Sequence, residues 1–111
     1  MKVDILNEDN GVTRMVLAGR MDIEGATATD MQFSIIAGSK KKVIVDLTSV
    51  DFMASLGMRT LIMSAKSIAS KGGKMVLLAP QPGVEKVLKS SGVDTVIPIA
   101  PDLAAATALV G

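Results

Sequence analysis

The segment from Val43 to Ile62 constrains the fold most, because it joins a buried strand to an amphipathic helix. It opens with Val43–Leu47, an apolar run rich in β-branched residues that is typical of a strand covered on both faces. Apolar residues then recur at helical spacing, so one side of a helix must face a core. They are Met58, Leu61, Ile62, Ala65, Ile68 and Ala69. Ser55 precedes them in the place of an N-cap, with its hydroxyl near the free amides of the first turn. The segment predicts a strand, a short loop and a helix that begins at an exposed serine.

The rest of the chain predicts further strands and helices around this unit. Residues 3–5 alternate apolar and polar, and residues 12–18 resume a strand pattern after the tight-turn signal Asn10-Gly11, so we expect an opening β-hairpin. Other expected elements are a loop over 19–25, helices over 26–38, 84–92 and from Pro101-Asp102, and strands over 75–79 and 96–99. This order predicts one α/β domain over residues 1–111. Its small mixed β-sheet has an N-terminal hairpin and then parallel strands, flanked by about four helices.

The absence of cysteine and histidine excludes several kinds of chemistry. Thiol nucleophiles, disulfides, histidine metal sites and Ser-His-Asp triads each require one of these residues. Ser55 also lacks the hydrolase motif Gly-x-Ser-x-Gly, because Met53 stands at the position of its first glycine. We therefore expect no enzyme, no catalytic residue, and no metal or cofactor site.

Charge and aromatic content argue against nucleic acid and membrane partners. The formal net charge is +1 with both signs interspersed, so no extended surface for DNA or an anionic membrane is expected. Phe33 and Phe52 are the only aromatic residues, which leaves almost no platform for stacking bases. The first ten residues are too charged for a signal peptide, and no apolar run approaches about 18 residues. We expect a cytoplasmic protein that does not insert into a membrane.

Two motifs resemble those of the anti-sigma-factor antagonists of the STAS family (sulphate transporter and anti-sigma-factor antagonist). The first, Phe52-Met53-Ala54-Ser55-Leu56-Gly57-Met58, is similar to the family's phosphorylated segment, in which an apolar-rich loop and an Asp-Ser-x-Gly-type turn open a helix. The second, Gly19-Arg20-Met21-Asp22, resembles the family's Gly-x-x-Asp turn between the second strand and the first helix. The expected order of elements is similar to the STAS fold along the whole chain. The resemblance therefore implies a single STAS domain over residues 1–111.

This resemblance implies a regulatory switch centred on Ser55. The unphosphorylated form would bind an anti-sigma factor that is itself an ATP-dependent serine kinase, and would so release a sigma factor for transcription. Phosphorylation of Ser55 would end the binding, and a metal-dependent serine phosphatase would restore it. The residues expected to contact the partner are Met21, Asp22, Asp51, Met53, Ala54, Leu56, Gly57 and Met58.

The polar and small residues next to Ser55 leave some alternatives open. Asp22 and Asp51 would either add negative potential beside Ser55 or bond local backbone amides in turns. Ala54 departs from the family, which most often has Asp before the phosphorylated serine. That difference removes a carboxylate that could bond the serine hydroxyl or recruit the kinase.

The apolar residues around Ser55 also have two interpretations. Methionine suits an adaptable partner surface, and we expect Met53 to be exposed, whereas Met58 on the apolar stripe should lie in the core. Gly57 would either keep space open for a partner or allow close packing of the first helical turn. In the first case a large residue such as Arg at position 57 would leave the fold largely intact.

Two other functions are compatible with parts of the sequence. A STAS subunit of a membrane transporter, such as the small cytosolic partner of a lipid-transport ATPase, would use the same fold with Ser55 only as a helix cap. A phospho-aspartate receiver domain needs a carboxylate cluster for Mg²⁺ after its first strand and a lysine after its last strand. This chain opens with a hairpin pattern and has no lysine after Gly92. The anti-sigma-factor antagonist is therefore the leading hypothesis.

Overall fold

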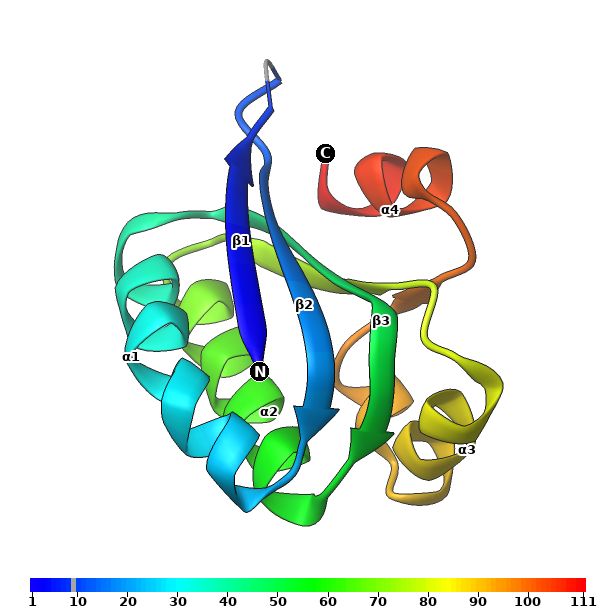
Figure 1. Cartoon of the computed structure of the whole chain (residues 1–111). Helices are drawn as coiled ribbons and strands as arrows, with labels where there is room; N and C mark the ends of the chain where they lie inside the picture. The colour runs from blue at the N-terminus through cyan, green and yellow to red at the C-terminus, as the bar shows by residue number, and fades with distance from the viewer. Residues whose placement is uncertain (9) are drawn as a thin grey trace.

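A computed structural model describes residues 1–8 and 10–111, and within them five strands and four α-helices alternate after an N-terminal hairpin (Figure 1). The strands are β1 (Lys2–Asn7), β2 (Thr13–Met21), β3 (Lys42–Met53), β4 (Lys74–Leu78) and β5 (Ile99–Ala100). The helices are α1 (Ile23–Ser39), α2 (Ser55–Ser70), α3 (Pro82–Ser90) and α4 (Leu103–Val110), with a 3-10 turn at Val93–Thr95. The strand order is β1-β2-β3-β4-β5, with β1 antiparallel to β2 and all other pairs parallel. This confirms the predicted mixed sheet.

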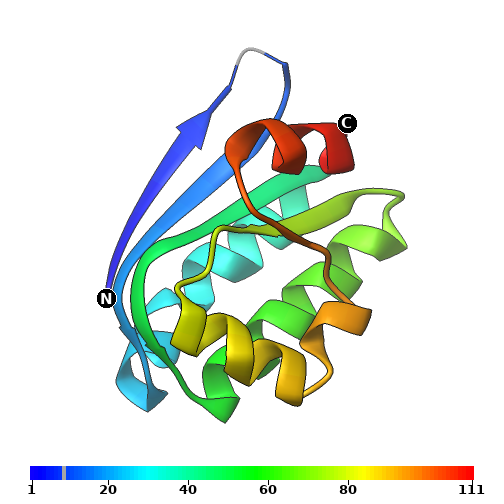
Figure 2. The same ribbon diagram turned by 90° about the vertical axis from the view of Figure 1, so that its right-hand side faces the viewer.

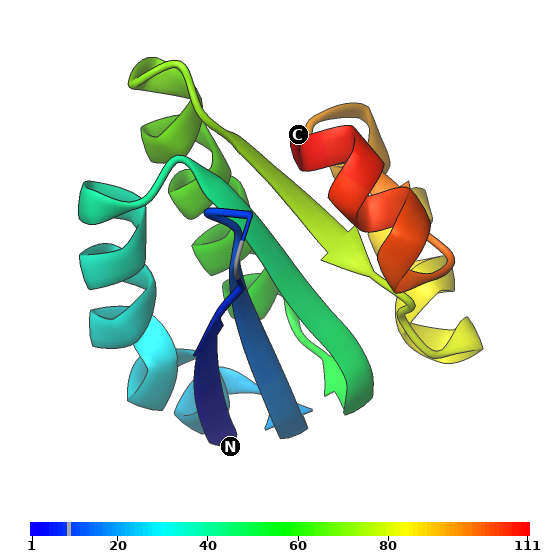
Figure 3. The same ribbon diagram turned by 90° about the horizontal axis from the view of Figure 1, so that it is seen from above.

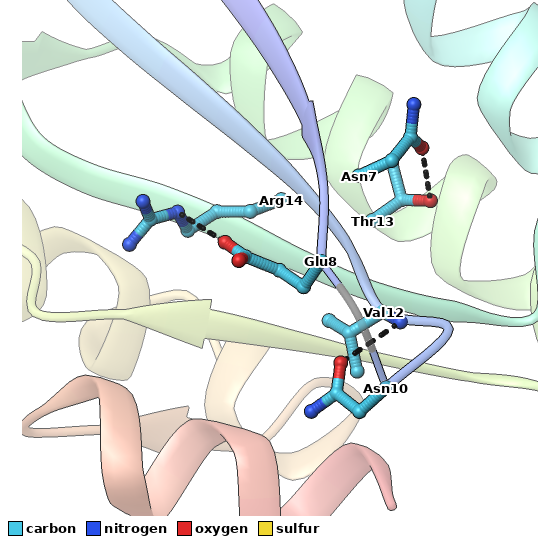
Figure 4. A network of polar contacts seen from close by, with 6 residues as sticks. All are labelled: Asn7, Glu8, Asn10, Val12, Thr13 and Arg14. Carbon is cyan, nitrogen blue, oxygen red and sulfur yellow. Dashed lines mark hydrogen bonds and ion pairs between the residues drawn. The ribbon is translucent and has the colours of Figure 1, made fainter.

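Local contacts hold the turn of the β1–β2 hairpin (Figure 4). The backbone N–H of Val12 donates to Oδ1 of Asn10 at 3.2 Å, and Arg14 Nε lies 3.4 Å from Glu8 Oε1. Gly11 has a φ of 81°, which glycine adopts without the steric penalty of a Cβ. The Asn10-Gly11 signal thus predicted the hairpin for the right physical reason.

Helices cover both faces of the sheet, with α4 on the face opposite α1 and α2 (Figure 2). On the α1/α2 face, Val43, Val45 and Leu47 of β3 belong to one large buried cluster with side chains of α1, α2 and α3. On the other face, Ile44 belongs to a smaller cluster with Ala106 of α4. The β3 run is therefore buried on both sides, as its continuous apolar sequence predicted. Within the described residues, no helix is both long enough and apolar enough to cross a membrane.

Two predicted loops are wrong in extent. Of the loop over 19–25, β2 takes residues 19–21 and α1 takes residues 23–25, and the loop before Ser55 is reduced to Ala54. β2 continues through Arg20 to Met21, and β3 continues through Phe52 to Met53. The register pairs Arg20 with Phe52 and Met21 with Met53, after irregularities that let the two strands bend together. Long-range pairing of β2 with β3 extends both strands, and the local patterns did not predict this extension.

The strand predicted over residues 96–99 is also wrong in its extent. A 3-10 turn occupies Val93–Thr95, and β5 is only Ile99–Ala100. Pro98 has no N–H to donate, but its carbonyl accepts a hydrogen bond from Leu77 at 2.9 Å. β5 therefore pairs only with the last two residues of β4.

Candidate functional site

The ends of β2 and β3 meet at one edge of the sheet, and α1 and α2 begin directly after them (Figure 1). The backbone N–H of Ala54 donates to the carbonyl of Met21 at 2.9 Å, which joins the two strand–helix junctions. This contact brings the Gly19–Asp22 motif beside the Phe52–Met58 motif, although about thirty residues separate them in the sequence. Both motifs singled out in the sequence therefore lie at the same place.

Ser55 is exposed and is the first residue of α2, as predicted, but it is not the N-cap. Ala54 takes that position, with an extended backbone (φ −96°, ψ 169°), and its carbonyl accepts the first helical bond, from Met58 N at 3.1 Å. The expectation of an N-cap at Ser55 is therefore wrong by one residue. The bend needed for a cap falls at Ala54, because the Ala54–Met21 hydrogen bond fixes where β3 ends.

The N-terminus of α2 has no side-chain cap within the described chain. The first amides of a helix have no partner inside the helix, so those of Ser55, Leu56 and Gly57 remain free to bind water or an anion. The helix dipole adds a partial positive charge at the same point. A negatively charged group on Ser55 would lie in a favourable electrostatic environment.

Asp22 acts as the N-cap of α1, which supports the interpretation that assigned it to local turn chemistry. Its Oδ1 accepts a hydrogen bond from Gly25 N at 2.8 Å, and its Oδ2 lies 3.6 Å from Nε of Arg20. The Gly25 amide, and then the nearby guanidinium of Arg20, lower the pKa of Asp22 below its usual value. Arg20 offsets part of the charge of Asp22, and Asp51 is exposed on β3.

The methionines of the predicted partner surface lie in the core. Met21 is fully buried and Met53 is only 4% exposed, so the expected exposure of Met53 is wrong. Met58 is buried, as its place on the apolar stripe predicted. Met21 and Met53 end two paired strands on the face that α2 covers, and their side chains pack beneath the first turn of that helix.

Gly57 is a packing residue in this structure. A Cβ at this position would lie 2.5 Å from Cγ of Met21 and 2.9 Å from Sδ of Met53. The expectation that a large residue at position 57 would leave the fold largely intact is therefore wrong. Only a glycine lets the first turn of α2 approach the two methionines this closely.

Accessible side chains around Ser55 include several that the sequence did not single out. Phe52 is 39% exposed, and the guanidinium of Arg20 lies 4.3 Å from the centre of its ring, at cation–π distance. Arg59 is exposed one helical turn after Ser55, a spacing at which side chains on a helix are neighbours. We call the exposed or partly exposed group the Ser55 surface: Arg20, Asp22, Asp51, Phe52, Ser55, Leu56 and Arg59.

A weak signal for Phe52 was present in the sequence, since it is one of only two aromatic residues. The pairing of Arg20 with Phe52 depends on the shifted register of β2 and β3, which no local pattern predicts.

Among the described residues, no three His, Cys, Asp or Glu side chains are grouped as a metal site requires.

Comparisons with known proteins agree with this architecture. Residues 5–106 match the sequence profile of the STAS domain. A Bordetella bronchiseptica protein named as an anti-sigma factor antagonist, BtrV, is 29% identical over 98 residues, which cover 88% of this chain and 78% of that protein.

Solved structures share the fold at lower sequence identity. A Thermotoga maritima protein described as an anti-sigma factor antagonist superposes with a TM-score of 0.89 at 23% identity, covering 97% of this chain and 93% of that one. The Bacillus cell fate determinant SpoIIAA, solved in its phosphorylated form, has a TM-score of 0.73 at 19% identity, with coverage of 97% and 99%.

Proposed function

Because this chain belongs to the STAS domain family, we propose that it is an anti-sigma-factor antagonist controlled by phosphorylation. The unphosphorylated form binds an anti-sigma factor with serine kinase activity and so releases a sigma factor. The partner phosphorylates Ser55, which ends the binding, and a serine phosphatase restores it. One observation carries this proposal: Ser55 is exposed at an uncapped helix N-terminus, within an accessible surface of mixed apolar and charged groups.

The position of Ser55 would let the fold accept a phosphate. A phosphoserine adds about −1.5 to −2 charge at neutral pH. The free amides of the first turn of α2 can donate to its oxygens, and Arg59 lies one turn away on the same helix. Phosphorylation should therefore leave the stability of the domain nearly unchanged, so its effect must be exerted on a partner.

The same surface explains how a phosphate would prevent docking. Phe52 and Leu56 are 39% and 37% exposed beside Ser55, and they offer apolar area to a partner. A phosphate among them would have to lose its hydration on binding, and it would repel an acidic or nucleotide-bearing partner surface. Two relatives support this interpretation: BtrV by its name as an anti-sigma factor antagonist, and SpoIIAA by its structure in a phosphorylated form.

Substitution of Ser55 tests the proposal. Ser55→Asp should bind the purified anti-sigma kinase at least about tenfold more weakly by calorimetric titration, because like charges across an interface cost several kcal/mol and about 1.4 kcal/mol is tenfold. Its melting temperature should stay near that of the wild type, since a helix N-terminus accepts a carboxylate. Ser55→Ala should bind normally and take up no phosphate from ATP.

Ser49→Asp is a matched control, because Ser49 is exposed on β3 but lies outside the Ser55 surface. It should bind the kinase like the wild type. If Ser55→Asp binds as tightly as the wild type, charge at Ser55 is not the switch. A transporter ATPase recovered with the native protein, in place of an anti-sigma factor, would support the role of a transporter subunit.

A further inference from the structure

Helix α1 carries apolar residues on its outer side as well as on its buried side. Its inner side contributes Phe33 and Ile36 to the core, yet Met31 and Ile35 on the outer side are 73% and 61% exposed. Apolar residues are less concentrated on one side of α1 than they are on α2 and α3. The outer side of α1 also carries Glu24, Thr27 and Asp30, so it mixes apolar and polar groups, as the surface of a non-permanent interface does.

Exposed apolar residues continue from α1 onto α2. Five large ones, between 37% and 73% exposed, belong to these two helices: Ile23, Met31, Ile35, Leu56 and Met63. Figure 3 shows α1 and α2 on the side of the sheet away from α4, with their outer sides facing away from the rest of the chain. We call the outer sides of α1 and α2 the helix face.

A groove of about 360 Å³ runs between α1 and α2 on this face. Small residues line part of it, among them Ala37, Gly38, Ser64 and Ser67, and the larger Leu56, Arg59 and Met63 of α2 also line it. Met31 follows the groove residue Asp30 on α1 and is 73% exposed, so the face presents a bulky apolar side chain close to a groove that is lined in part by small residues. Ridges of one helix pack into such grooves of another.

Charge is separated between the two helices of the face. All charged residues of α1 are acidic (Glu24 and Asp30), and all those of α2 are basic (Arg59 and Lys66). Asp30 and Arg59 line the same groove, but they form no ion pair with each other in the described structure. The acidic side chains of α1 could therefore pair with basic side chains of a partner molecule, and the basic side chains of α2 with acidic ones.

We propose that the helix face binds a second copy of this chain through a two-fold contact, in which the α1 ridge of each copy lies in the α1/α2 groove of the other. A two-fold interface is self-complementary, so every contact is made twice. The acidic α1 of each copy would then lie against the basic α2 of its partner. The helix face carries both a bulky apolar side chain and a groove, and both acidic and basic residues. A surface that binds a copy of itself needs such complementary features.

The size of the helix face suits such a dimer. Helix α1 has 17 residues, about 25 Å in length, and two packed helices span about 20 Å, so the face measures about 500 Å² in flat projection. A contact of this size lies toward the small end of specific interfaces, in which each partner typically contributes roughly 800 Å². We therefore expect a reversible dimer and not a permanent one.

Analytical ultracentrifugation of the full chain over about 1 to about 300 μM would test this. The wild type should show concentration-dependent dimers, and Met31→Glu combined with Ile35→Glu should be monomeric throughout with an unchanged melting temperature. Val96→Glu is the matched control, because Val96 is an exposed apolar residue (46%) outside the helix face. It should dimerise like the wild type. A wild type that stays monomeric over this range overturns the proposal, as does a dimer that survives both glutamates.

Reversing the charges of Asp30 and Arg59 distinguishes binding of a second copy from binding of a different protein. Asp30→Arg alone and Arg59→Asp alone should each weaken the dimer, because each leaves like charges facing one another across the two-fold contact. The double variant should recover it, since exchanging both charges restores the match in the same homodimer. Failure of the double variant to recover would overturn the proposed charge pairing. None of these readouts involves the anti-sigma factor, so this proposal and the proposed function can fail separately.

Discussion

Helices α1 and α2 begin at the same edge of the sheet, but in the part of the chain that the structure describes only α1 has a side-chain cap on its first turn. At α1, Oδ1 of Asp22 caps the helix by accepting a hydrogen bond from Gly25 N at 2.8 Å. At α2, Ala54 takes the corresponding position and offers no cap. The free amides of α2 lie next to the exposed hydroxyl of Ser55, whereas those of α1 are partly satisfied. The comparison shows that a side chain caps one helix start, whereas the other is left, among the described residues, without a side-chain cap at the place where we propose a phosphate.

The two helix starts share one feature, a glycine as the third helical residue. A Cβ on Gly25 would clash with the backbone carbonyl of Arg20, and one on Gly57 would lie 2.5 Å from Cγ of Met21. Both helices therefore approach the end of β2 more closely than a side chain allows. The N-cap residue decides whether a side chain bonds the first amides of a helix, and it differs between α1 and α2. The glycine allows the first turn to pack closely against β2, and both helices have it.

The largest expected effect comes from filling the space at these glycines. Gly57→Ala should lower the free energy of unfolding by about 1–3 kcal/mol, the usual penalty of overpacking. Gly25→Ala should lower it more, because the Arg20 carbonyl would lie closer to the new Cβ than any backbone atom does at Gly57, where the nearest is the Met21 carbonyl at 2.9 Å. Urea denaturation measures both.

Gly38→Ala in α1 and Gly83→Ala in α3 are the controls for this experiment, since nothing lies within 4 Å of a Cβ at either site. They should gain up to about 1 kcal/mol through helix propensity. Wild-type stability in Gly57→Ala would show that Met21 and Met53 repack freely, and the close approach would then not explain Gly57.

Exchanging the caps should have a smaller effect. Ala54→Asp should stabilise the protein by about 1 kcal/mol, because a carboxylate at the N-cap satisfies a free amide of α2. Asp22→Ala should lower the melting temperature by uncapping α1. Thermal melts of both variants, with Ala54→Gly as a side-chain-free reference, measure the contrast between the helix starts. If Ala54→Asp brings no gain, the amides of α2 are not available to an anion, and the phosphate proposal loses its main support.

The smallest expected effect is a difference in pH dependence. The pKa of Asp22 in the folded protein lies below its usual value, so its stabilising contribution is complete above the pKa of the unfolded chain, about 3.9. It is lost as the pH falls through the lower, folded value. Urea titrations from neutral to strongly acidic pH should show wild type and Asp22→Ala converging in acid. A difference that stays constant with pH would mean that the carboxylate charge does not contribute.

The sequence alone determined most of the architecture. The Asn10-Gly11 turn, the doubly buried run of β3 and the apolar stripe of α2 are local patterns, and each records the surface that its own element must bury. The exposed position of Ser55 at a helix start follows from the same patterns. These features were predictable because their cause lies within a few residues of the chain.

Tertiary structure alone decided the details of the site. The shifted pairing of β2 and β3 extends both strands to Met21 and Met53, buries the two methionines under α2 and places Arg20 over Phe52. The Ala54–Met21 hydrogen bond then moves the N-cap from Ser55 to Ala54. These outcomes depend on contacts between segments about thirty residues apart, whose register is set by how two strands bend together. Local propensity carries no record of that register, so the chain specified where the serine would be exposed but not which neighbours would surround it.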